Sequence, residues 1–231
     1  MMRVIGLIGG TSWESTAVYY RLLNEEVRRR LGGSHSARIL MVSLDGGDLE
    51  GFMSSDQWEE VGIRVADAAR SLEAGGADMV LICSNTNHQC AQAVEAVVGL
   101  PLVHIVDPTA DAVREANIRR VGLLGTRYTM ERRFLRDRLE DRGLEVIVPG
   151  EPDRTTIHNI QFQELVFGKL LDTSRRAFID VIGRLVGQGA EGVILGCTEF
   201  GMLIGASDTS VPLFDTTVLH AKRAVDLALA E

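Results

Sequence analysis

Residues 76–86 read GADMVLICSNT, and residues 189–199 read GAEGVILGCTE. Each stretch runs from Gly-Ala and an acidic residue into a short apolar run and ends in a small polar or sulfur-containing cluster. This pattern is typical of a buried strand followed by a turn that carries functional side chains. Two copies predict one active site built from two similar halves, with one catalytic group from each half.

Two further pairs of segments indicate an internal duplication. Residues 4–10 (VIGLIGG) match 121–126 (VGLLGT), and residues 100–102 (LPL) match 211–213 (VPL). The first of these pairs is offset by 116 residues, the second by 111 and the GA-acid pair by 113, so the order and nearly the spacing are kept. A period this long does not suit a solenoid and predicts a duplicated α/β half.

The composition is that of a soluble globular protein, with 45% hydrophobic and 24% charged residues in a chain of 231. The net charge is −8 and no run is rich in Lys or Arg, which argues against nucleic acid as a partner. The sequence has neither an apolar stretch long enough for a membrane span nor the features of a signal peptide. We therefore expect a cytoplasmic protein with no membrane partner.

Three cysteines, Cys83, Cys90 and Cys197, are an odd number without a CxxC pair. This count argues against a disulfide framework or a structural zinc site, and we expect no metal. In a reducing compartment a cysteine is either a small core residue or a working thiol.

Apolar runs of strand length alternate with stretches of helical periodicity along the whole chain. We expect strands at 4–8, 37–44, 79–83, 102–106, 121–125, 144–148, 192–196 and near 213. We expect helices from Ser12 to Gly32 and at 58–74, from Thr86, and at 108–117, 129–142, 157–171, 174–188 and 216–230. Such alternation predicts βαβ units with mainly parallel sheets.

The predicted fold class is therefore α/β, with two pseudo-symmetric doubly wound domains. We expect the first domain to comprise residues 1–106 plus 213–231 and the second to comprise residues 107–212. Ligands of open α/β sheets bind outside the carboxyl ends of strands, where the turns of both halves lie. The sequence thus predicts an active site in an interdomain cleft.

The register of the repeat selects the residue that corresponds to Cys197. Subtracting the offset of 113 from 197 gives 84, so Cys197 aligns with Ser84, and Gly196 aligns with Cys83. Neighbouring side chains on a strand point to opposite faces. We therefore expect Ser84 to face the site and Cys83 to point into the core, and we expect Cys90 in the core or on a helix surface.

Two groups on opposite faces of one carbon suit a racemase, in which one takes the α-proton and the other delivers a proton. A cysteine thiol suits this role, and we expect its pKa to fall at the start of a helix. Backbone N–H groups of the two turns can hold the substrate carboxylate and stabilise the charge that develops. Serine is a poor base without an activating group, and we expect His88 to be a surface or capping residue.

The segments Ile8–Thr16, Ser84–His88, Leu124–Met130 and Gly196–Glu199 resemble the aspartate/glutamate racemase superfamily of cofactor-independent racemases. The resemblance covers essentially the whole chain and is strongest to the bacterial subgroup of broad-specificity or L-aspartate/glutamate-specific racemases. It implies two pseudo-symmetric α/β domains, proton transfer on an amino-acid substrate without pyridoxal phosphate or another cofactor, and often a homodimer.

The resemblance also implies roles for individual residues. Most relatives carry a catalytic cysteine before the first Asn-Thr, whereas this chain has Ser84 there; the nearest subgroup has threonine at that position, with cysteine just before it. Cys197 is then the main acid/base, with Ser84 opposite and catalysis biased toward one enantiomer. The turns and the resemblance together point to these substrate-binding residues: Gly10, Thr11, Asn85, Thr86, Thr126, Glu164, Thr198 and Glu199.

Aspartate-specific relatives hold the distal carboxylate of the substrate with basic side chains. From Ile39 to Ile63 this chain has no Lys, Arg or His, and Val166 stands beside Glu164 where the family has a lysine. Because carboxylate recognition favours arginine, we expect a pocket for a non-acidic side chain. The alternative is that Arg127 or another residue reaches the pocket from elsewhere.

Other functions stay open. An arylmalonate decarboxylase of the same superfamily needs only one cysteine, which protonates an enolate from one face. A non-catalytic small-molecule binding domain would leave Cys197 an ordinary thiol. A nicotinamide enzyme is disfavoured because Gly6-Leu7-Ile8-Gly9-Gly10 lacks the GxGxxG spacing.

Overall fold

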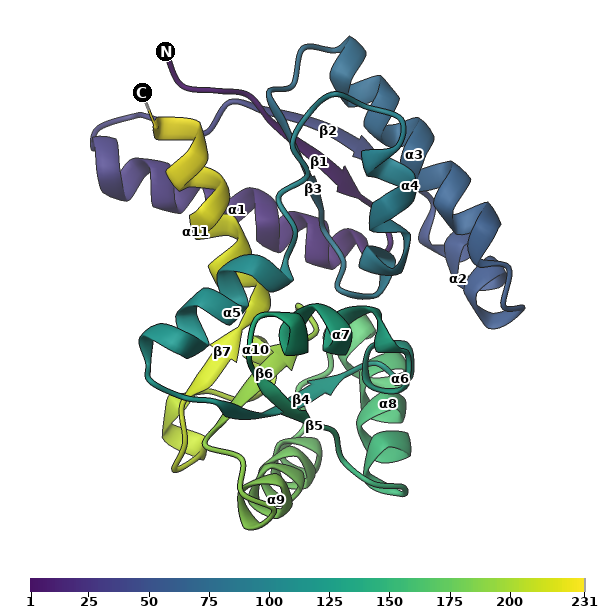
Figure 1. Ribbon diagram of the computed structural model, residues 1–231, viewed down its shortest axis with the longest axis vertical. Helices are drawn as coiled ribbons and strands as arrows, with labels where there is room; N and C mark the ends of the chain where they lie inside the picture. Colours follow the sequence, from purple (N-terminus) through teal and green to yellow (C-terminus); the bar gives the residue numbers. More distant parts are fainter. Residues whose placement is uncertain (231) are drawn as a thin grey trace. The chain divides into compact units, whose positions relative to one another are not determined.

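The computed structural model describes residues 1–230, which form two compact units (Figure 1). Unit 1 comprises Met1–Ile105 and the C-terminal segment from His220, and unit 2 comprises Val106–Leu219. Each unit is built around its own parallel β-sheet flanked by helices. The expectation of a duplicated α/β fold with parallel sheets is confirmed.

The sheet of unit 1 has the strand order β2-β1-β3, with β1 at Ile5–Gly9, β2 at Ile39–Ser43 and β3 at Met79–Ile82. Every residue of β1 and β3 is buried, as continuous apolar strands of parallel sheets are. The helices are α1 (Trp13–Leu31), α2 (Gly46–Ser54), α3 (Trp58–Ala74), η1 (Thr86–Cys90), α4 (Ala91–Glu95) and α11 (Thr216–Leu229), the last of which starts in unit 2.

Side chains of α1 and α11 form one apolar core with β1 and β3, which includes Tyr19, Leu23 and Val225. On the other face α3 approaches the sheet at Gly6, where an added Cβ would lie 3.2 Å from the Leu72 side chain. Alternate residues of β1 thus meet different helix layers, which is why the strand is apolar throughout.

The sheet of unit 2 has the order β5-β4-β6-β7, with β4 at Arg120–Gly125, β5 at Glu145–Ile147, β6 at Gly192–Gly196 and β7 at Leu213–Asp215. Its core contains an edge-to-face aromatic pair, Phe178 and Phe200, with ring centroids 4.7 Å apart. The helices are α5 (Val106–Glu115), α6 (Arg127–Glu131), α7 (Arg133–Asp141), α8 (Asp153–Gln163), η2 (Leu165–Phe167), α9 (Asp172–Gly187), α10 (Phe200–Leu203) and η3 (Ala206–Asp208).

Three expected elements differ in detail. The expected strand 102–106 is reduced to a single bridge between Leu102 and Val80, because the chain turns into α5 at Val106. The expected helix 129–142 is divided at Arg132, whose backbone is extended (φ −78°, ψ 150°). The segment 157–171 is helical only to Gln163 and then forms the short turn η2.

The division between the units also differs from the expected boundaries. Residues 213–219 were expected in the first domain, but β7 pairs with β6 in the sheet of unit 2. The chain therefore returns to unit 1 at His220, within α11, and not at residue 213.

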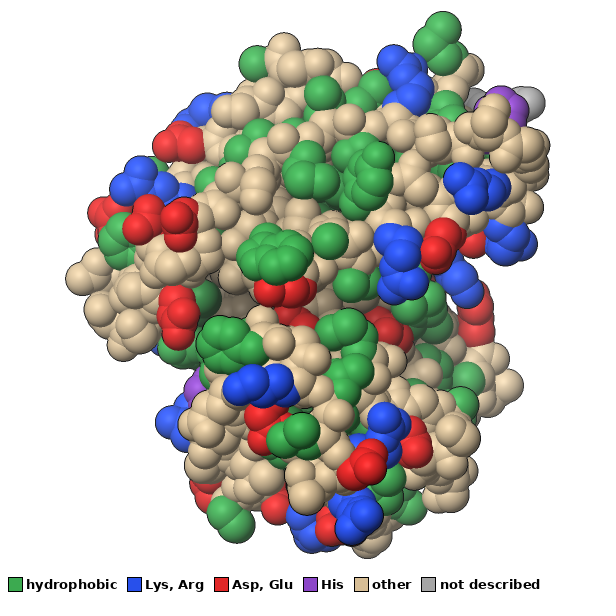
Figure 2. All heavy atoms as spheres, turned by 180° about the vertical axis from the view of Figure 1, so that it is seen from behind, with side chains coloured by type: hydrophobic (Ala, Val, Ile, Leu, Met, Phe, Trp, Pro, Cys, Tyr) green, Lys and Arg blue, Asp and Glu red, His purple; other side chains and the backbone are tan. Residues whose placement is uncertain are grey.

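Acidic and basic side chains are interspersed on the face drawn in Figure 2, without a large basic patch. This distribution agrees with a chain of net charge −8. Among residues 1–230, no helix combines the length and the apolar character that a membrane span requires.

Candidate functional site

The first site element is the turn after β1, at Gly10 and Thr11. Gly10 has φ +92°, and a Cβ there would lie 1.9 Å from the carbonyl oxygen of Leu44. Its N–H donates to Thr16 Oγ1 over 2.9 Å, and this hydrogen bond connects the Gly10 turn to the first helical turn of α1. Only glycine permits this backbone course, so the sequence Gly-Gly-Thr fixes the position of the turn.

The second element is the turn after β3, where Cys83 and Ser84 point to different surroundings. Cys83 is 1% exposed and belongs to the core of unit 1, and this burial raises the pKa of its thiol. Ser84 is half-buried, and its Oγ accepts a hydrogen bond from the Asn87 N–H over 3.3 Å. Asn87 Nδ2 donates to Thr11 Oγ1 over 2.7 Å, so the two turns of unit 1 are joined.

The expected substrate-binding residues Asn85 and Thr86 follow in the same turn, and both are buried. Since β1 and β3 pair with Ile8 opposite Ile82, this turn and the Gly10 turn leave the sheet at the same edge. Unit 1 therefore brings Gly10, Thr11, Ser84, Asn85 and Thr86 to one edge of its sheet.

His88 is buried at 2% exposure, which corrects the expectation of a surface or capping residue. Its Nδ1 lies 2.7 Å from the carbonyl oxygen of Ser84, and its Nε2 lies 3.2 Å from the backbone N of Ile105. The ring is held inside because both of its nitrogens meet backbone groups, a pairing between distant segments that local sequence does not reveal.

In unit 2 the corresponding turn follows β6 and contains Cys197, Thr198 and Glu199, all buried. The Cys197 thiol donates to Glu199 Oε2 over 3.1 Å, and Thr198 Oγ1 donates to the same oxygen over 2.6 Å. Burial raises the pKa of the Cys197 thiol well above its ordinary value, and the Glu199 carboxylate raises it further.

The expectation that the pKa of Cys197 falls at the start of a helix is therefore wrong. The helix that follows, α10, has a single turn from Phe200 to Leu203. The thiol faces a carboxylate in a buried environment, and both conditions favour the neutral sulfur. At rest Cys197 is a protonated thiol that donates to Glu199.

Thr126 occupies the turn after β4, next to Cys197. Gly125 pairs with Gly196, so the residues that follow them leave the sheet side by side. The Thr126 hydroxyl accepts from the Thr129 N–H over 3.3 Å and caps α6. Unit 2 thus gathers Thr126, Cys197, Thr198 and Glu199 at one sheet edge.

Strand register gives Ser84 and Cys197 equivalent places in the two sheets. Ile8 pairs with Ile82 in unit 1, and Leu124, which aligns with Ile8 in the repeat, pairs with Leu195 in unit 2. Ser84 lies two residues after Ile82, and Cys197 lies two residues after Leu195. The three-dimensional register therefore agrees with the alignment of Ser84 with Cys197.

Glu164 follows a helix and not a strand: it is the residue directly after α8. Its carboxylate accepts a hydrogen bond from the Ser174 hydroxyl of α9, while the adjacent Leu165 packs in the same core as Cys197. Arg127 is engaged within unit 2, where its Nη2 donates to Thr155 Oγ1 over 3.1 Å and its Nε lies 3.8 Å from Glu131 Oε1.

Asn87 and Thr16 are site residues that the sequence reasoning did not select. Each holds a turn through one side-chain hydrogen bond. The sequence could have indicated them only by their position, since both lie within the segments Ile8–Thr16 and Ser84–His88 that carry the family resemblance.

Other features of the described chain supply no second site of the same kind. Residues 1–230 contain no group of three or more His, Cys, Asp or Glu side chains placed to hold a metal ion. A groove of about 540 Å³ lies between α3 and the η1–α4 segment and is lined in part by Gly62, Cys90 and Ala93. Burial raises the pKa of Cys90 to about 11, so this thiol is neutral.

Each of the two units has a parallel sheet with a polar turn at an equivalent strand end, and this defines the class as a duplicated α/β protein. The Asp/Glu/hydantoin racemase family model matches residues 8–224. The chain belongs to this family.

Individual relatives agree with this assignment. The chain is 23% identical over 180 residues to the broad specificity amino-acid racemase RacX of Bacillus subtilis (strain 168), with 74% of each chain covered. The crystal structure of a candidate Asp/Glu racemase from Yersinia pestis is 46% identical with a TM-score of 0.93, covering 99% of this chain and 100% of that one. An aspartate racemase homologue from Pyrococcus horikoshii is 34% identical with a TM-score of 0.85, again covering 99% and 100%.

The resemblance seen in the sequence is thereby confirmed. The protein is an isomerase, an amino-acid racemase.

Proposed function

We propose that this racemase inverts an amino acid at Cα by proton transfer without a cofactor, with Cys197 as the main acid/base and Ser84 on the opposite face of the carbon. The observation that carries the proposal is the equivalent register of these two residues in the two sheets. One is a thiol and the other a hydroxyl, so their proton affinities differ widely. The reaction is therefore biased toward one enantiomer.

Glu199 supplies the base that Cys197 needs. With the thiol proton directed at Glu199 Oε2, transfer of that proton leaves a thiolate and a carboxylic acid. The thiolate then takes the α-proton, and the electron pair stays on Cα as the carbanion. Ser84 delivers its hydroxyl proton to the opposite face and is left as an alkoxide. The proton on Glu199 then passes to solvent and solvent protonates the Ser84 alkoxide, so that the thiol, the carboxylate and the hydroxyl are all restored. In the reverse direction Ser84 first loses its hydroxyl proton to solvent and takes the α-proton, and the Cys197 thiol donates its proton to the other face.

In this proposal, the turns of the two units bind the substrate carboxylate. Backbone N–H groups after Ser84 and after Cys197, with the hydroxyls of Thr11 and Thr126, form donors suited to an anion whose charge grows as the α-proton leaves. Asn85, Thr86, Thr198 and Gly10 belong to the same turns and are buried, which keeps competing water away.

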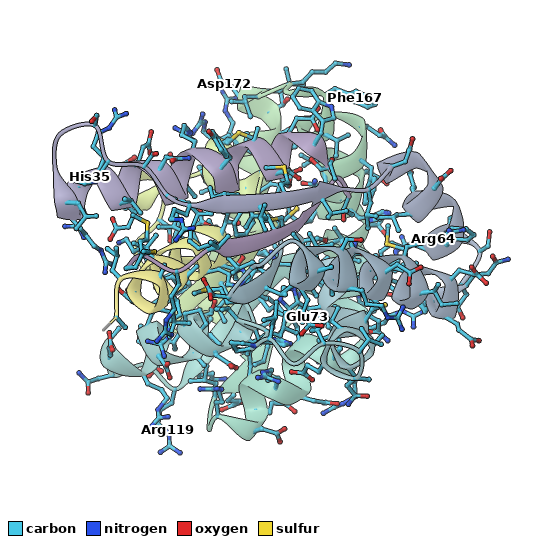
Figure 3. The ribbon with its side chains drawn as sticks, turned by 90° about the horizontal axis from the view of Figure 1, so that it is seen from above. His35, Arg64, Glu73, Arg119, Phe167 and Asp172 are labelled. Carbon is cyan, nitrogen blue, oxygen red and sulfur yellow. The ribbon has the colours of Figure 1, made fainter. Side chains whose placement is uncertain are left out.

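We further propose that the substrate side chain is uncharged. The stretch Ile39–Ile63, which contains α2, has no cation. The next residue, Arg64, is exposed on α3, and Figure 3 shows it at the outside of the molecule. Its guanidinium lies 5.8 Å from the centroid of the Phe52 ring. Glu164 brings an acidic group to unit 2 and Val166 an apolar one. An acidic substrate side chain would lack the basic partner that it requires.

The test is a panel of single-enantiomer amino acids incubated with the purified protein, followed by chiral chromatography. We expect neutral amino acids to racemise without added pyridoxal phosphate, and aspartate and glutamate to react far more slowly. Cys197→Ala abolishes the reaction, whereas Cys90→Ala, the matched removal of another buried thiol, keeps it. A requirement for pyridoxal phosphate, or activity in Cys197→Ala, would refute the proposed chemistry.

We also propose a homodimer in the cytoplasm. The family resemblance implies the dimer, and the three free cysteines suit a reducing compartment. Light scattering coupled to gel filtration should give twice the chain mass of 25.2 kDa.

A further inference from the structure

We infer that His88 is a positioning residue that holds the Ser84 turn for proton transfer at one face of the substrate carbon; this inference rests on the proposed function. His88 does not touch the reacting atoms. It acts through the backbone of Ser84, to which its ring is hydrogen-bonded over 2.7 Å.

The two contacts of the ring define one tautomer. The carbonyl oxygen of Ser84 can only accept, so Nδ1 carries the proton and donates. The N–H of Ile105 can only donate, so Nε2 accepts. His88 is therefore neutral, and it links the Ser84 peptide to Ile105, the last residue of the first segment of unit 1.

Neighbouring rings hold the imidazole in place. The His104 ring lies 4.6 Å from that of His88 and the His220 ring lies 5.8 Å away, measured between centroids. His220 is fixed in turn, since its Nδ1 is 2.8 Å from Tyr19 Oη and its Nε2 donates to the carbonyl oxygen of Val103 over 2.6 Å. All three histidines are buried, so the His88 ring has little freedom to release Ser84.

A buried histidine ring that anchors the reactive turn is found in the first half of the repeat and not at the equivalent position of the second. Adding the offset of 113 to 88 gives 201, and residue 201 is glycine. A Cβ at Gly201 would lie 2.3 Å from Asp215 Oδ2, so no side chain fits there without displacing that carboxylate. The Cys197 turn relies instead on the Glu199 carboxylate. The weaker acid/base, Ser84, is thus the one whose backbone is anchored by a buried ring.

Proton transfer depends on the placement of the donor to within a fraction of an ångström. Loss of the bond from His88 to the Ser84 carbonyl frees the turn, while the Cys197 turn, in the other unit, keeps its own contacts. We therefore expect a defect confined to the proton transfer that Ser84 performs.

Two substitutions separate the two bonds of the ring. In His88→Asn the amide nitrogen falls near the position of Nδ1 and can donate to the Ser84 carbonyl, but the contact with Ile105 is lost. In His88→Gln the amide oxygen reaches the position of Nε2 and can accept from the Ile105 N–H, but the contact with Ser84 is lost. Both variants bury an amide of similar polarity.

The measurement is α-proton exchange in D₂O for each enantiomer separately, with Ser84→Ala identifying the enantiomer whose exchange depends on Ser84. For that enantiomer we expect a loss of about tenfold in His88→Gln and less than about threefold in His88→Asn. Exchange of the other enantiomer should change less than about threefold in both. Tyr19→Phe, which removes the bond to His220 and leaves the Ser84 contact, should leave both rates within about twofold.

Thermal unfolding of each variant distinguishes positioning from folding. A loss that is equal for the two enantiomers, or that follows the melting temperature across all three variants, would overturn the inference while the proposed function stands. If His88→Gln does not fold, His88→Asn still tests the inference. This variant keeps the contact with Ser84, so a selective loss of exchange of the Ser84-dependent enantiomer in it would contradict the inference. Absence of any exchange in the wild type would overturn the proposed function together with this inference.

Discussion

At the scale of single residues, the adjacent side chains of Cys83 and Ser84 lie in different surroundings, the first in the core and the second in the half-buried turn. We predict that Ser84→Ala lowers racemisation at least tenfold with little change in stability, because the half-buried hydroxyl is removed from the reactive turn. Cys83→Ala should keep the activity and lose about 1 kcal/mol of unfolding free energy, since the thiol fills the core. Chiral assays and urea unfolding of both variants test this, and the reverse pattern would return the catalytic role to Cys83.

The environment of Cys197 predicts its reactivity. Its raised pKa should make alkylation by iodoacetamide slow at pH 8 and faster as the pH rises, because only the thiolate reacts. Glu199→Gln removes the carboxylate that disfavours the thiolate, so the pKa of Cys197 falls and alkylation at pH 8 accelerates. Racemisation should nevertheless decline in Glu199→Gln, since the acceptor of the thiol proton is lost. Mass spectrometry of the labelled peptide provides the rates; unchanged alkylation in the variant would contradict this picture.

At the scale of elements, the turn after β1 depends on one glycine. Gly10→Ala places a Cβ against the backbone of Leu44 at a positive φ, so we predict a loss of roughly 2–3 kcal/mol in unfolding free energy. Gly51→Ala is the matched control, because it lies within α2 with nothing near its Cβ position and should be neutral or stabilising by up to about 1 kcal/mol. Equal effects of the two substitutions in urea unfolding would show that the turn tolerates a side chain.

Helix α1 carries an ionic cluster that predicts a pH dependence. Glu26 binds Arg29 and Arg30, and Arg30 binds Asp226 of α11 over 2.6 Å. The bond from Arg29, followed by that from Arg30, lowers the pKa of Glu26 from 4.5 to about 2. A lowered carboxyl pKa stabilises the folded state above about pH 4.5, and this contribution disappears as the pH falls toward 2.

Glu26→Gln should therefore lower the unfolding free energy at pH 7 by about 1–2 kcal/mol, a value reduced for solvent screening at the rim of the cluster. The difference from the wild type should shrink steadily between pH 4.5 and pH 2. The control is Glu25→Gln, whose exposed partner Arg21 lies 3.9 Å away and contributes less than about 0.5 kcal/mol. A difference that persists at the lowest pH would exclude ionisation of Glu26 as its source.

At the scale of the whole molecule, periodicity and repeat predicted most of the fold. Continuous apolar runs such as 79–82 and 192–196 predicted β3 and β6, because burial on both faces leaves no polar positions. The repeat aligned Ser84 with Cys197 because equivalent strands keep equivalent registers. The bridge at Leu102 and the break at Arg132 were not predicted, since chain direction at these points depends on packing rather than on local pattern.

The parts of the site that escaped prediction depend on how the folded chain buries and orients each side chain. His88 is buried because Ile105 and Ser84 both meet its ring. Burial raises the pKa of the Cys197 thiol and the neighbouring Glu199 carboxylate raises it further, although the place of Cys197 in the sequence resembles an activating turn. Sequence spacing predicts which residues share a sheet edge, but not the solvation of each group.

The central claim is that two equivalent turns carry unequal acid/base groups. The most direct test is α-proton exchange in D₂O, followed by NMR, on separate L- and D-enantiomers of one racemised amino acid. We predict faster exchange of one enantiomer in the wild type, loss of that exchange in Cys197→Ala, and nearly equal exchange of both enantiomers in Ser84→Cys. Equal exchange of both enantiomers by the wild type would contradict the claim.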